Sequence, residues 1–261
     1  MSLPKVISHR GGRSWAPENT LAAFRMSLDI GVFGLELDVH RCASGELVVI
    51  HDEDINRTTN GVGLVKDVTY DELRRLDAGS WWDEAHGQPG ESRFVGERIP
   101  LLTDVLALVD GKAMLNIEIK NTPVDYPGIE DDLLDALAQY KHTETVIVSS
   151  FDHRLMSLLH RKRGDLNIAL LADALLIDMP LMARQMGATY WHPCFGSLRR
   201  EAVEEAHQSG IAVHAWTINA QREWQWAVEW GIDGIITDDP LALTKYLQRQ
   251  KQLLAQADER E

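Results

Sequence analysis

IAVHAWTINAQREWQWAVEWGIDGIITDD, residues 211–239, contains one complete strand–helix–strand unit. The apolar runs 211–216 and 233–237 have the length of β-strands, and 220–230 has the spacing of an amphipathic helix. We expect Asn219 to cap the start of this helix. Two strands that are joined by a helix pair in parallel through a right-handed crossover, so this stretch predicts part of a parallel α/β sheet.

The same alternation runs through most of the chain. Strands are predicted at 5–9, 34–40, 47–51, 113–119, 145–149, 167–172, 188–192, 211–216 and 233–237. Helices are predicted at 19–30, 102–110, 129–141, 152–163, 179–186, 199–209, 220–230 and 240–255. Apart from one extra segment, this is eight rounds of strand and then helix. The length of 261 residues suits a barrel that typically needs about 250. We therefore predict an α/β TIM (β/α)₈ barrel, with residues 1–261 as a single domain.

Residues 52–100 interrupt this alternation. They contain Asn60-Gly61-Val62-Gly63, the pair Trp81-Trp82 and a stretch rich in Gly and Pro, with a short helix predicted at 69–76. No strand or helix pattern holds across the whole segment. We interpret it as a small insertion after the second strand, forming a lid or wall above the barrel rather than a second domain.

The composition excludes several classes of partner. The formal net charge is −14, which argues against nucleic acid or an anionic membrane surface, because both select basic proteins. No apolar run approaches the roughly 18 residues that cross a bilayer. The N-terminus has no basic segment followed by an apolar one, and the chain has only two cysteines. We expect a cytoplasmic protein without stable membrane association; the sequence leaves its oligomeric state open.

Polar residues collect where the predicted strands end, which is where TIM barrels build their active sites. Glu36 and Asp38 are two residues apart on one strand, so both project to the same face. Glu118 and Lys120 have the same spacing on another strand. Three inward carboxylates without a His or Cys cluster suit one hard divalent cation, Mg²⁺ or Ca²⁺. The alternative is a set of structural ion pairs with Arg10 and Lys120.

Two histidines end apolar runs and are expected to face one another across the barrel mouth. These are His9 and His51, and a histidine pair can supply a base and an acid near neutral pH. His192 and His214 also lie near strand ends, but a structural role is the commoner one for a lone histidine. With the carboxylates and Arg10 close by, His9 and His51 are interpreted as catalytic.

An ordered set of motifs spans nearly the whole chain. The set is His9-Arg10-Gly11-Gly12, Pro17-Glu18-Asn19-Thr20, Glu36-Leu37-Asp38-Val39, Val48-Val49-Ile50-His51-Asp52, Arg57-Thr58-Thr59-Asn60-Gly61, Leu76-Asp77-Ala78-Gly79-Ser80-Trp81, Arg98-Ile99-Pro100, Asn116-Ile117-Glu118-Ile119-Lys120, Ser150-Phe151-Asp152, Trp216-Thr217 and Gly234-Ile235-Ile236-Thr237-Asp238. In this order, the motifs resemble those of the glycerophosphodiester phosphodiesterases. No single motif is decisive, but the ordered set is highly specific.

The resemblance implies a role for each candidate residue. Glu36, Asp38 and Glu118 would bind the metal, and His9 and His51 would form the acid–base pair. Arg10 and Lys120 would contact the phosphoryl oxygens. Three further residues would complete the substrate site. Glu18 would orient His9 or Arg10, and the aromatic side chains of Phe151 and Trp216 would form a wall of the site.

The resemblance also implies a reaction. The substrate would be a small glycerophosphodiester, hydrolysed to glycerol 3-phosphate and an alcohol, with a cyclic phosphate as intermediate. We interpret His9 as the first base and His51 as the first acid. Two alternatives stay open. One is a phosphodiesterase acting on lysophospholipids or a phosphoinositol head group, with a lipid tail held by Trp81, Trp82 and Phe94. The other is a binding protein that has lost catalysis, which the complete set of charged residues argues against.

Overall fold

The computed structural model describes residues 3–87 and 93–258 of the chain. Within these residues it contains one nine-stranded sheet. Eight parallel strands close into a barrel, because β1 pairs with β2 on one side and with β9 on the other. The strands are β1 Lys5–Ser8, β2 Gly34–Arg41, β3 Leu47–Val49, β4 Met114–Ile119, β5 Val146–Ser150, β6 Asn167–Ala172, β7 Tyr190–Pro193, β8 Ala212–Ala215 and β9 Gly234–Thr237. The predicted barrel is confirmed, and the extra apolar run is β3, which pairs antiparallel with β2.

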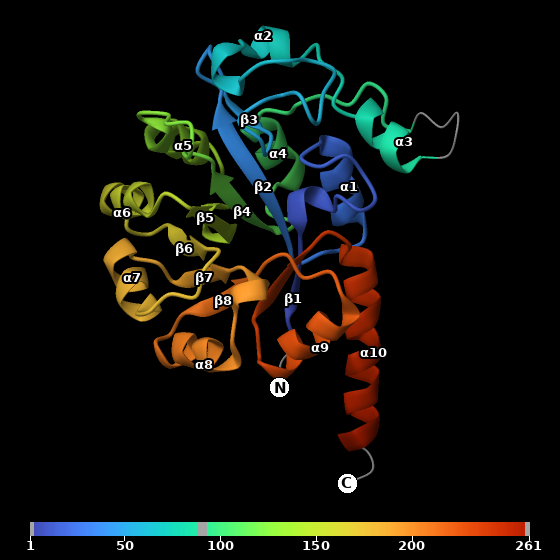
Figure 1. Ribbon diagram of the computed structural model, residues 1–261, viewed down its shortest axis with the longest axis vertical. Coiled ribbons are helices and arrows are strands. Elements are labelled where there is room, and N and C mark those ends of the chain that lie inside the picture. Colours follow the sequence, from blue (N-terminus) through green and yellow to red (C-terminus); the bar gives the residue numbers. More distant parts are fainter. Residues whose placement is uncertain (1–2, 88–92, 259–261) are drawn as a thin grey trace.

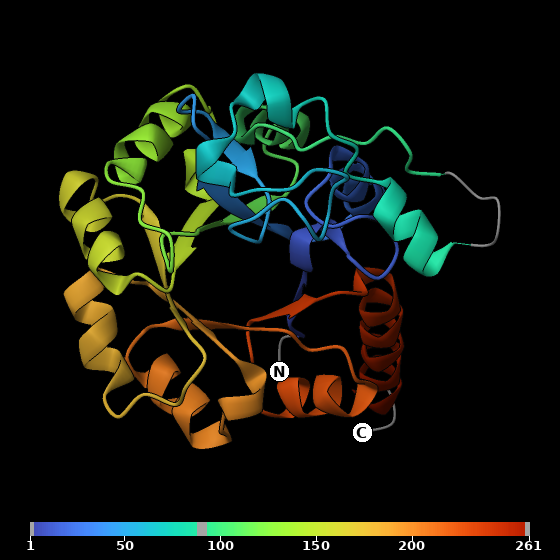
Figure 2. The ribbon, with the colours of Figure 1, turned by 45° about the horizontal axis from the view of Figure 1, so that its top comes forward.

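The helices lie outside the ring of strands (Figures 1 and 2). They are α1 Leu21–Asp29, α2 Tyr70–Leu73, α3 Ser80–His86, α4 Leu102–Val109, α5 Ile129–Ala138, α6 His153–Lys162, α7 Met179–Met186, α8 Arg200–Gln208, α9 Gln221–Glu229 and α10 Pro240–Asp258. Short 3₁₀ helices occur at His9–Gly11, Val65–Asp67, Thr143–Thr145 and Phe195–Ser197. Every predicted helix is present. Among the described residues, none of the helices is both long enough and apolar enough to span a bilayer.

The insertion carries α2 and α3, and α2 lies beyond the carboxyl end of β2 (Figure 1). Residues 88–92 of the predicted insertion lie outside the described residues. The segment has an apolar cluster of its own, which includes Ile55, Val65 and Leu73. Trp82 and Phe94 are each 6% exposed and pack against Ala16 and Ala23. Both side chains are therefore used in packing, which leaves little of their surface for the lipid tail that the alternative interpretation assigned to them.

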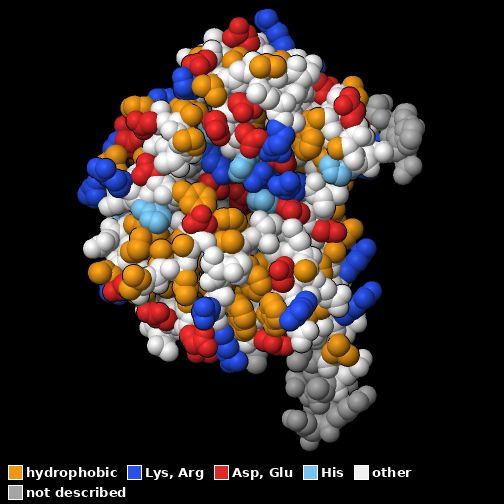
Figure 3. All heavy atoms as spheres, in the orientation of Figure 1, with side chains coloured by type: hydrophobic (Ala, Val, Ile, Leu, Met, Phe, Trp, Pro, Cys, Tyr) orange, Lys and Arg blue, Asp and Glu red, His pale blue; other side chains and the backbone are white. Residues whose placement is uncertain are grey.

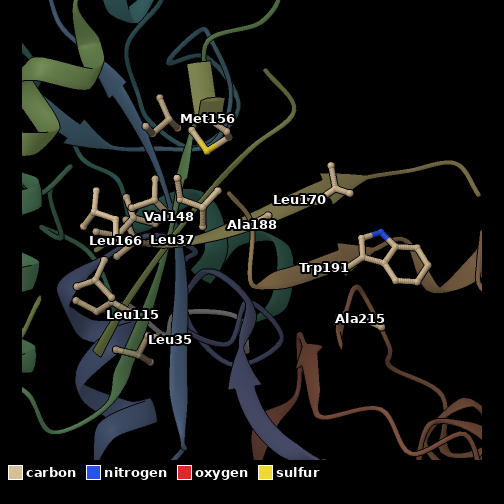
Figure 4. Packing of buried hydrophobic residues seen from close by; sticks show 14 of the residues in the cluster. Leu35, Leu37, Leu115, Val148, Met156, Leu166, Leu170, Ala188, Trp191 and Ala215 are labelled. Carbon is tan, nitrogen blue, oxygen red and sulfur yellow. The ribbon is translucent and has the colours of Figure 1, made fainter. Parts of the chain in front are cut away.

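Along β2, apolar and charged side chains alternate between the outer and the inner face of the barrel wall. Leu35, Leu37 and Leu115 point outward and pack with residues of the surrounding helices (Figure 4). The intervening residues Glu36 and Asp38 point into the barrel, since successive side chains of a strand project to opposite faces. The apolar core of the molecule thus lies between the strands and the helices, and this arrangement leaves the barrel mouth free for polar chemistry.

Replacing Leu115 with alanine is expected to lower the free energy of unfolding by about 2–5 kcal/mol, the usual range for a buried leucine. Leu115 is fully buried in the layer between the strands and the helices. The measurement is urea unfolding. Leu253→Ala serves as a control with the same chemical change, because Leu253 is 59% exposed. Equal losses of stability in the two variants would contradict this placement of the core.

Candidate active site

One cavity opens at the carboxyl end of the barrel strands. Figure 3 shows Lys, Arg, Asp, Glu and His side chains gathered around a hollow in the centre of this face. The cavity brings together most of the predicted site residues, from six strands or the loops that follow them: His9, Arg10, Glu36, His51, Glu118, Lys120, Phe151 and Trp216. Asp38 belongs to the same site, because its carboxylate lies close to those of Glu36 and Glu118. Glu18 contacts the site through a hydrogen bond from Arg10.

The three predicted metal ligands form a compact buried cluster. Oxygen atoms of Glu36, Asp38 and Glu118 all lie within 4.8 Å of one another. Asp38 and Glu118 are direct partners in the pairing of β2 with β4, which explains their proximity. Burial, followed by the charges of Asp38 and Glu118, raises the pKa of Glu36 well above its usual range. Such a cluster is destabilised by like charge, so it favours a bound cation.

Two cationic side chains flank this cluster. Lys120 Nζ lies 3.0 Å from an oxygen of Asp38 and also donates a hydrogen bond to Glu118. Arg10 Nε lies 3.4 Å from the other oxygen of Asp38. Both side chains line the cavity, so each contacts the carboxylates while remaining next to the space for a ligand. The carboxylates raise the pKa of both groups against the opposing effect of burial, and both stay positively charged.

The loop after β1 explains why the motif contains two glycines. Arg10 has φ 49°, and Gly11 and Gly12 have φ 82° and 91°, so the chain turns through three left-handed residues. A Cβ atom at Gly11 would lie 2.7 Å from that of Ala23. This turn also directs the backbone N–H of Arg10 to Glu36, at 2.9 Å. The tight approach therefore places Arg10 beside the carboxylates.

The motif at residues 17–20 supports the cluster from behind. Glu18 accepts hydrogen bonds from Arg10 at 2.7 Å and from Arg57 at 2.8 and 3.0 Å. Asn19 donates to Asp38 at 2.8 Å, and Thr20 caps α1. Glu18 therefore orients Arg10, one of the two roles that the sequence suggested for it, and it does not itself line the cavity. Asn19 was missed, although its motif was noted.

The ion pairs of Glu18 predict a loss of stability in acid. Burial raises the pKa of Glu18, but Arg57 and Arg10 outweigh it and hold the value at about 2, against 4.5 for an ordinary glutamate. The carboxylate therefore stabilises the fold fully above about pH 4.5, and this contribution is lost as the pH falls toward 2. In urea unfolding with EDTA between pH 6 and 2.5, the wild type should lose more stability than Glu18→Gln. The exposed Glu84→Gln serves as control; equal pH dependence in all three proteins would contradict the prediction.

Each candidate catalytic histidine is held by an aspartate through the same ring atom. His9 Nδ1 lies 2.6 Å from Asp238, and His51 Nδ1 lies 2.7 Å from Asp52. Asp52 in turn accepts from Arg57 Nε at 2.6 Å. Because the Nδ1 atoms are used in this way, the Nε2 atoms are the ones left for a substrate. This geometry suits a pair of proton-transfer groups.

Asn219 does not cap α9, contrary to the sequence prediction. The residue before α9 is Ala220, and Asn219 donates to Asp238 at 2.9 Å instead. Its side-chain oxygen accepts from Thr237 and from the backbone of Asp238. Asn219 therefore fixes the aspartate that holds His9. No local pattern distinguishes this use of an asparagine from a helix cap.

Two aromatic side chains form one wall of the cavity, as expected. Phe151 and Trp216 meet edge to face, with ring centroids 5.8 Å apart. Phe151 is 40% exposed at the rim, and the indole N–H of Trp216 donates to the backbone oxygen of His192 at 2.8 Å. This wall offers apolar contact to the carbon atoms of a ligand.

The fold and the site together define a TIM-barrel enzyme whose residues suit acid–base chemistry on an anionic substrate. Residues 9–242 match the model of the glycerophosphoryl diester phosphodiesterase family. The chain therefore belongs to this family, and the resemblance seen in the sequence is confirmed.

Individual relatives agree with this assignment. The chain is 41% identical to a glycerophosphodiester phosphodiesterase of Caldanaerobacter subterraneus subsp. tengcongensis, over 94% of this chain and 98% of that protein. It is 35% identical to one of Bacillus altitudinis, over 95% of this chain and all of that protein. Among solved structures, it is similar to an Oleispira antarctica phosphodiesterase in complex with the product sn-glycerol-3-phosphate. That likeness has a TM-score of 0.84 and 26% identity, over 94% of this chain and 97% of that one.

Proposed function

We propose that this protein hydrolyses glycerophosphodiesters to glycerol 3-phosphate and an alcohol, with His9 and His51 as the proton-transfer pair and one divalent cation as cofactor. The observation that carries the proposal is that both histidines, each held by an aspartate, line one cavity with the carboxylate cluster. The product bound by the Oleispira antarctica relative supports the choice of substrate.

Glu36, Asp38 and Glu118 would hold the cation, Mg²⁺ or Ca²⁺. All the donor atoms are carboxylate oxygens that lie close together and are buried, which fits a hard cation. When bound, such a cation offsets the charge of the phosphate and lowers the pKa of a nearby hydroxyl group. Asn19 and Lys120 contact the same carboxylates and would keep them in position.

The residues of the chain then bind the phosphate and transfer protons. Arg10 and Lys120 would donate to the nonbridging oxygens of the phosphate. His9 accepts the proton of the substrate's 2-hydroxyl group while that oxygen bonds to phosphorus and the bond to the alcohol breaks. His51 gives a proton to the departing oxygen. A nucleophile within the substrate has a large effective concentration, which favours this route through a cyclic phosphate.

Water opens the cyclic phosphate in the second step, with the two histidines exchanging roles. His51 takes a proton from water as the water oxygen bonds to phosphorus, and the bond between phosphorus and the 2-oxygen breaks. His9 returns its proton to the 2-oxygen, so that both histidines regain their first protonation state. We place this hydrolysis in the cytoplasm, because the chain has only two cysteines. The negative net charge favours small soluble substrates over a membrane surface or nucleic acid.

The choice of substrate is tested by comparing glycerophosphocholine with lysophosphatidylcholine, with Mg²⁺ or Ca²⁺ present, and measuring choline release. We expect the soluble diester to have the higher kcat/KM, since Trp82 and Phe94 are buried away from the cavity. A higher kcat/KM for the lysophospholipid would favour the lipid alternative. No turnover of either compound would favour a binding protein without catalysis.

A further inference from the structure

His192 is a buried side chain in the catalytic cavity that the proposed reaction does not use. It lies on β7, is 0% exposed and lines the cavity together with His9 and Glu118. Among the described residues, neither of its ring nitrogens has a hydrogen-bond partner. Buried polar atoms are almost always paired, so a residue of this kind on a cavity wall points to a bound group.

His192 lies on the strand opposite β2, which carries Glu36 and Asp38. On one side, β4, β5 and β6 separate β7 from β2; on the other, β1, β9 and β8 do so. A group that extends across the cavity from a phosphate beside the carboxylates and Arg10 would approach β7. Trp216, from the loop after β8, lies next to this region and donates to the backbone oxygen of His192.

Packing against neighbouring residues fixes the position of the His192 ring. His214 on β8 stacks against it, with ring centroids 5.2 Å apart and planes inclined by 23°. Gly234 makes room for His214, because a Cβ atom there would lie 2.6 Å from the His214 ring. Burial lowers the pKa of His192, and that of His214 to about 4. Both rings are therefore neutral near pH 7.

A neutral imidazole has one N–H donor and one acceptor nitrogen, which is also what a hydroxyl group offers. A phosphate oxygen only accepts, and Arg10 and Lys120 already supply donors on the other wall. A glycerophosphodiester has two hydroxyl groups, and the 2-hydroxyl is used in the proposed attack. The terminal hydroxyl group is left without a partner, just as His192 is.

We propose that His192 binds the terminal hydroxyl group of the glycerol moiety and so makes the enzyme select glycerol esters over propane-1,2-diol esters. This inference rests on the proposed function of the site. His214 has a positioning role in it, since it supports the ring of His192 without lining the cavity.

The test compares glycerophosphocholine with the phosphocholine ester of propane-1,2-diol, which keeps the 2-hydroxyl group and lacks the terminal one. Choline release gives kcat/KM for both. In the wild type, loss of the hydroxyl group should lower kcat/KM roughly 10- to 100-fold, because His192 is left buried and unpaired. In His192→Phe the two substrates should differ by less than about 3-fold, since the effects of interacting partners are not additive.

His142→Phe is the matched control, at a histidine that precedes β5, away from the carboxyl ends of the strands. It should keep the discrimination of the wild type. Equal kcat/KM for the two substrates in the wild type would overturn the inference without any variant, so the test stands even if His192→Phe does not fold. Full discrimination in a folded His192→Phe would overturn it as well. Cleavage of neither substrate by the wild type would instead overturn the proposed function, and this inference with it.

Discussion

Replacing His51 with alanine is expected to lower kcat for glycerophosphocholine by about 10²- to 10⁴-fold, the usual contribution of a proton-transfer group. The His51 ring lines the cavity, and its Nδ1 contacts Asp52. Its removal leaves the alcohol to depart without a proton. Glu36, Asp38 and Glu118 remain in place, so the cation concentration that gives half-maximal activity should hardly change.

The matched control for this prediction is His142→Ala, because His142 lies before β5 and far from the cavity along the barrel axis. It should retain the kcat of the wild type. Circular dichroism and urea unfolding would show that both variants are folded. A His51→Ala protein with a kcat within a few fold of the wild type would exclude His51 as a proton donor.

Replacing Glu118 with glutamine should act on the cation instead. The substitution preserves the size of the side chain and removes one of three clustered negative charges. The cation concentration required for half-maximal activity should rise roughly 10- to 100-fold, at least as much as for residues that only support a metal ligand. Much of the lost activity should return at saturating Mg²⁺ or Ca²⁺, which cannot be expected for His51→Ala.

Glu130→Gln is the control for the metal prediction, because Glu130 is also a buried glutamate but pairs with Lys162 on the helical layer. Its requirement for the cation should match that of the wild type. If His51→Ala and Glu118→Gln showed the same loss of cation affinity, the division between proton transfer and metal binding would be wrong.

The barrel fold and the polar residues at the carboxyl ends of its strands could be predicted, because both follow from local periodicity in the sequence. Alternating apolar residues identify the strands, and the polar residue after each apolar run marks the carboxyl end, as at His9 and His51. Closure of the sheet then brings these ends together, whatever their separation along the chain. The spacing of Glu36 and Asp38 was enough to predict that both project to the same face of their strand.

Most of the residues that hold the candidate catalytic groups could not be predicted, because they are distant in sequence from the groups that they contact; Asp52, next to His51, is the exception. Asp238 reaches His9 across the closing strand pair, and Asn219 reaches Asp238 from the preceding loop. Arg57 joins Asp52 to Glu18 from within the insertion, where no periodic pattern exists. His192 was interpreted as structural, since its unpaired nitrogens become apparent only when every neighbour is placed.

The most direct test of the central claim is the release of glycerol 3-phosphate from glycerophosphocholine. The protein is first treated with EDTA, and Mg²⁺ or Ca²⁺ is then added back to the wild type and to His9→Ala. We predict no release after EDTA, restored release by the wild type, and release by His9→Ala reduced by about 10²-fold or more at every cation concentration. Unchanged release after EDTA, or equal release by His9→Ala, would contradict a site in which a cation and a histidine pair act together.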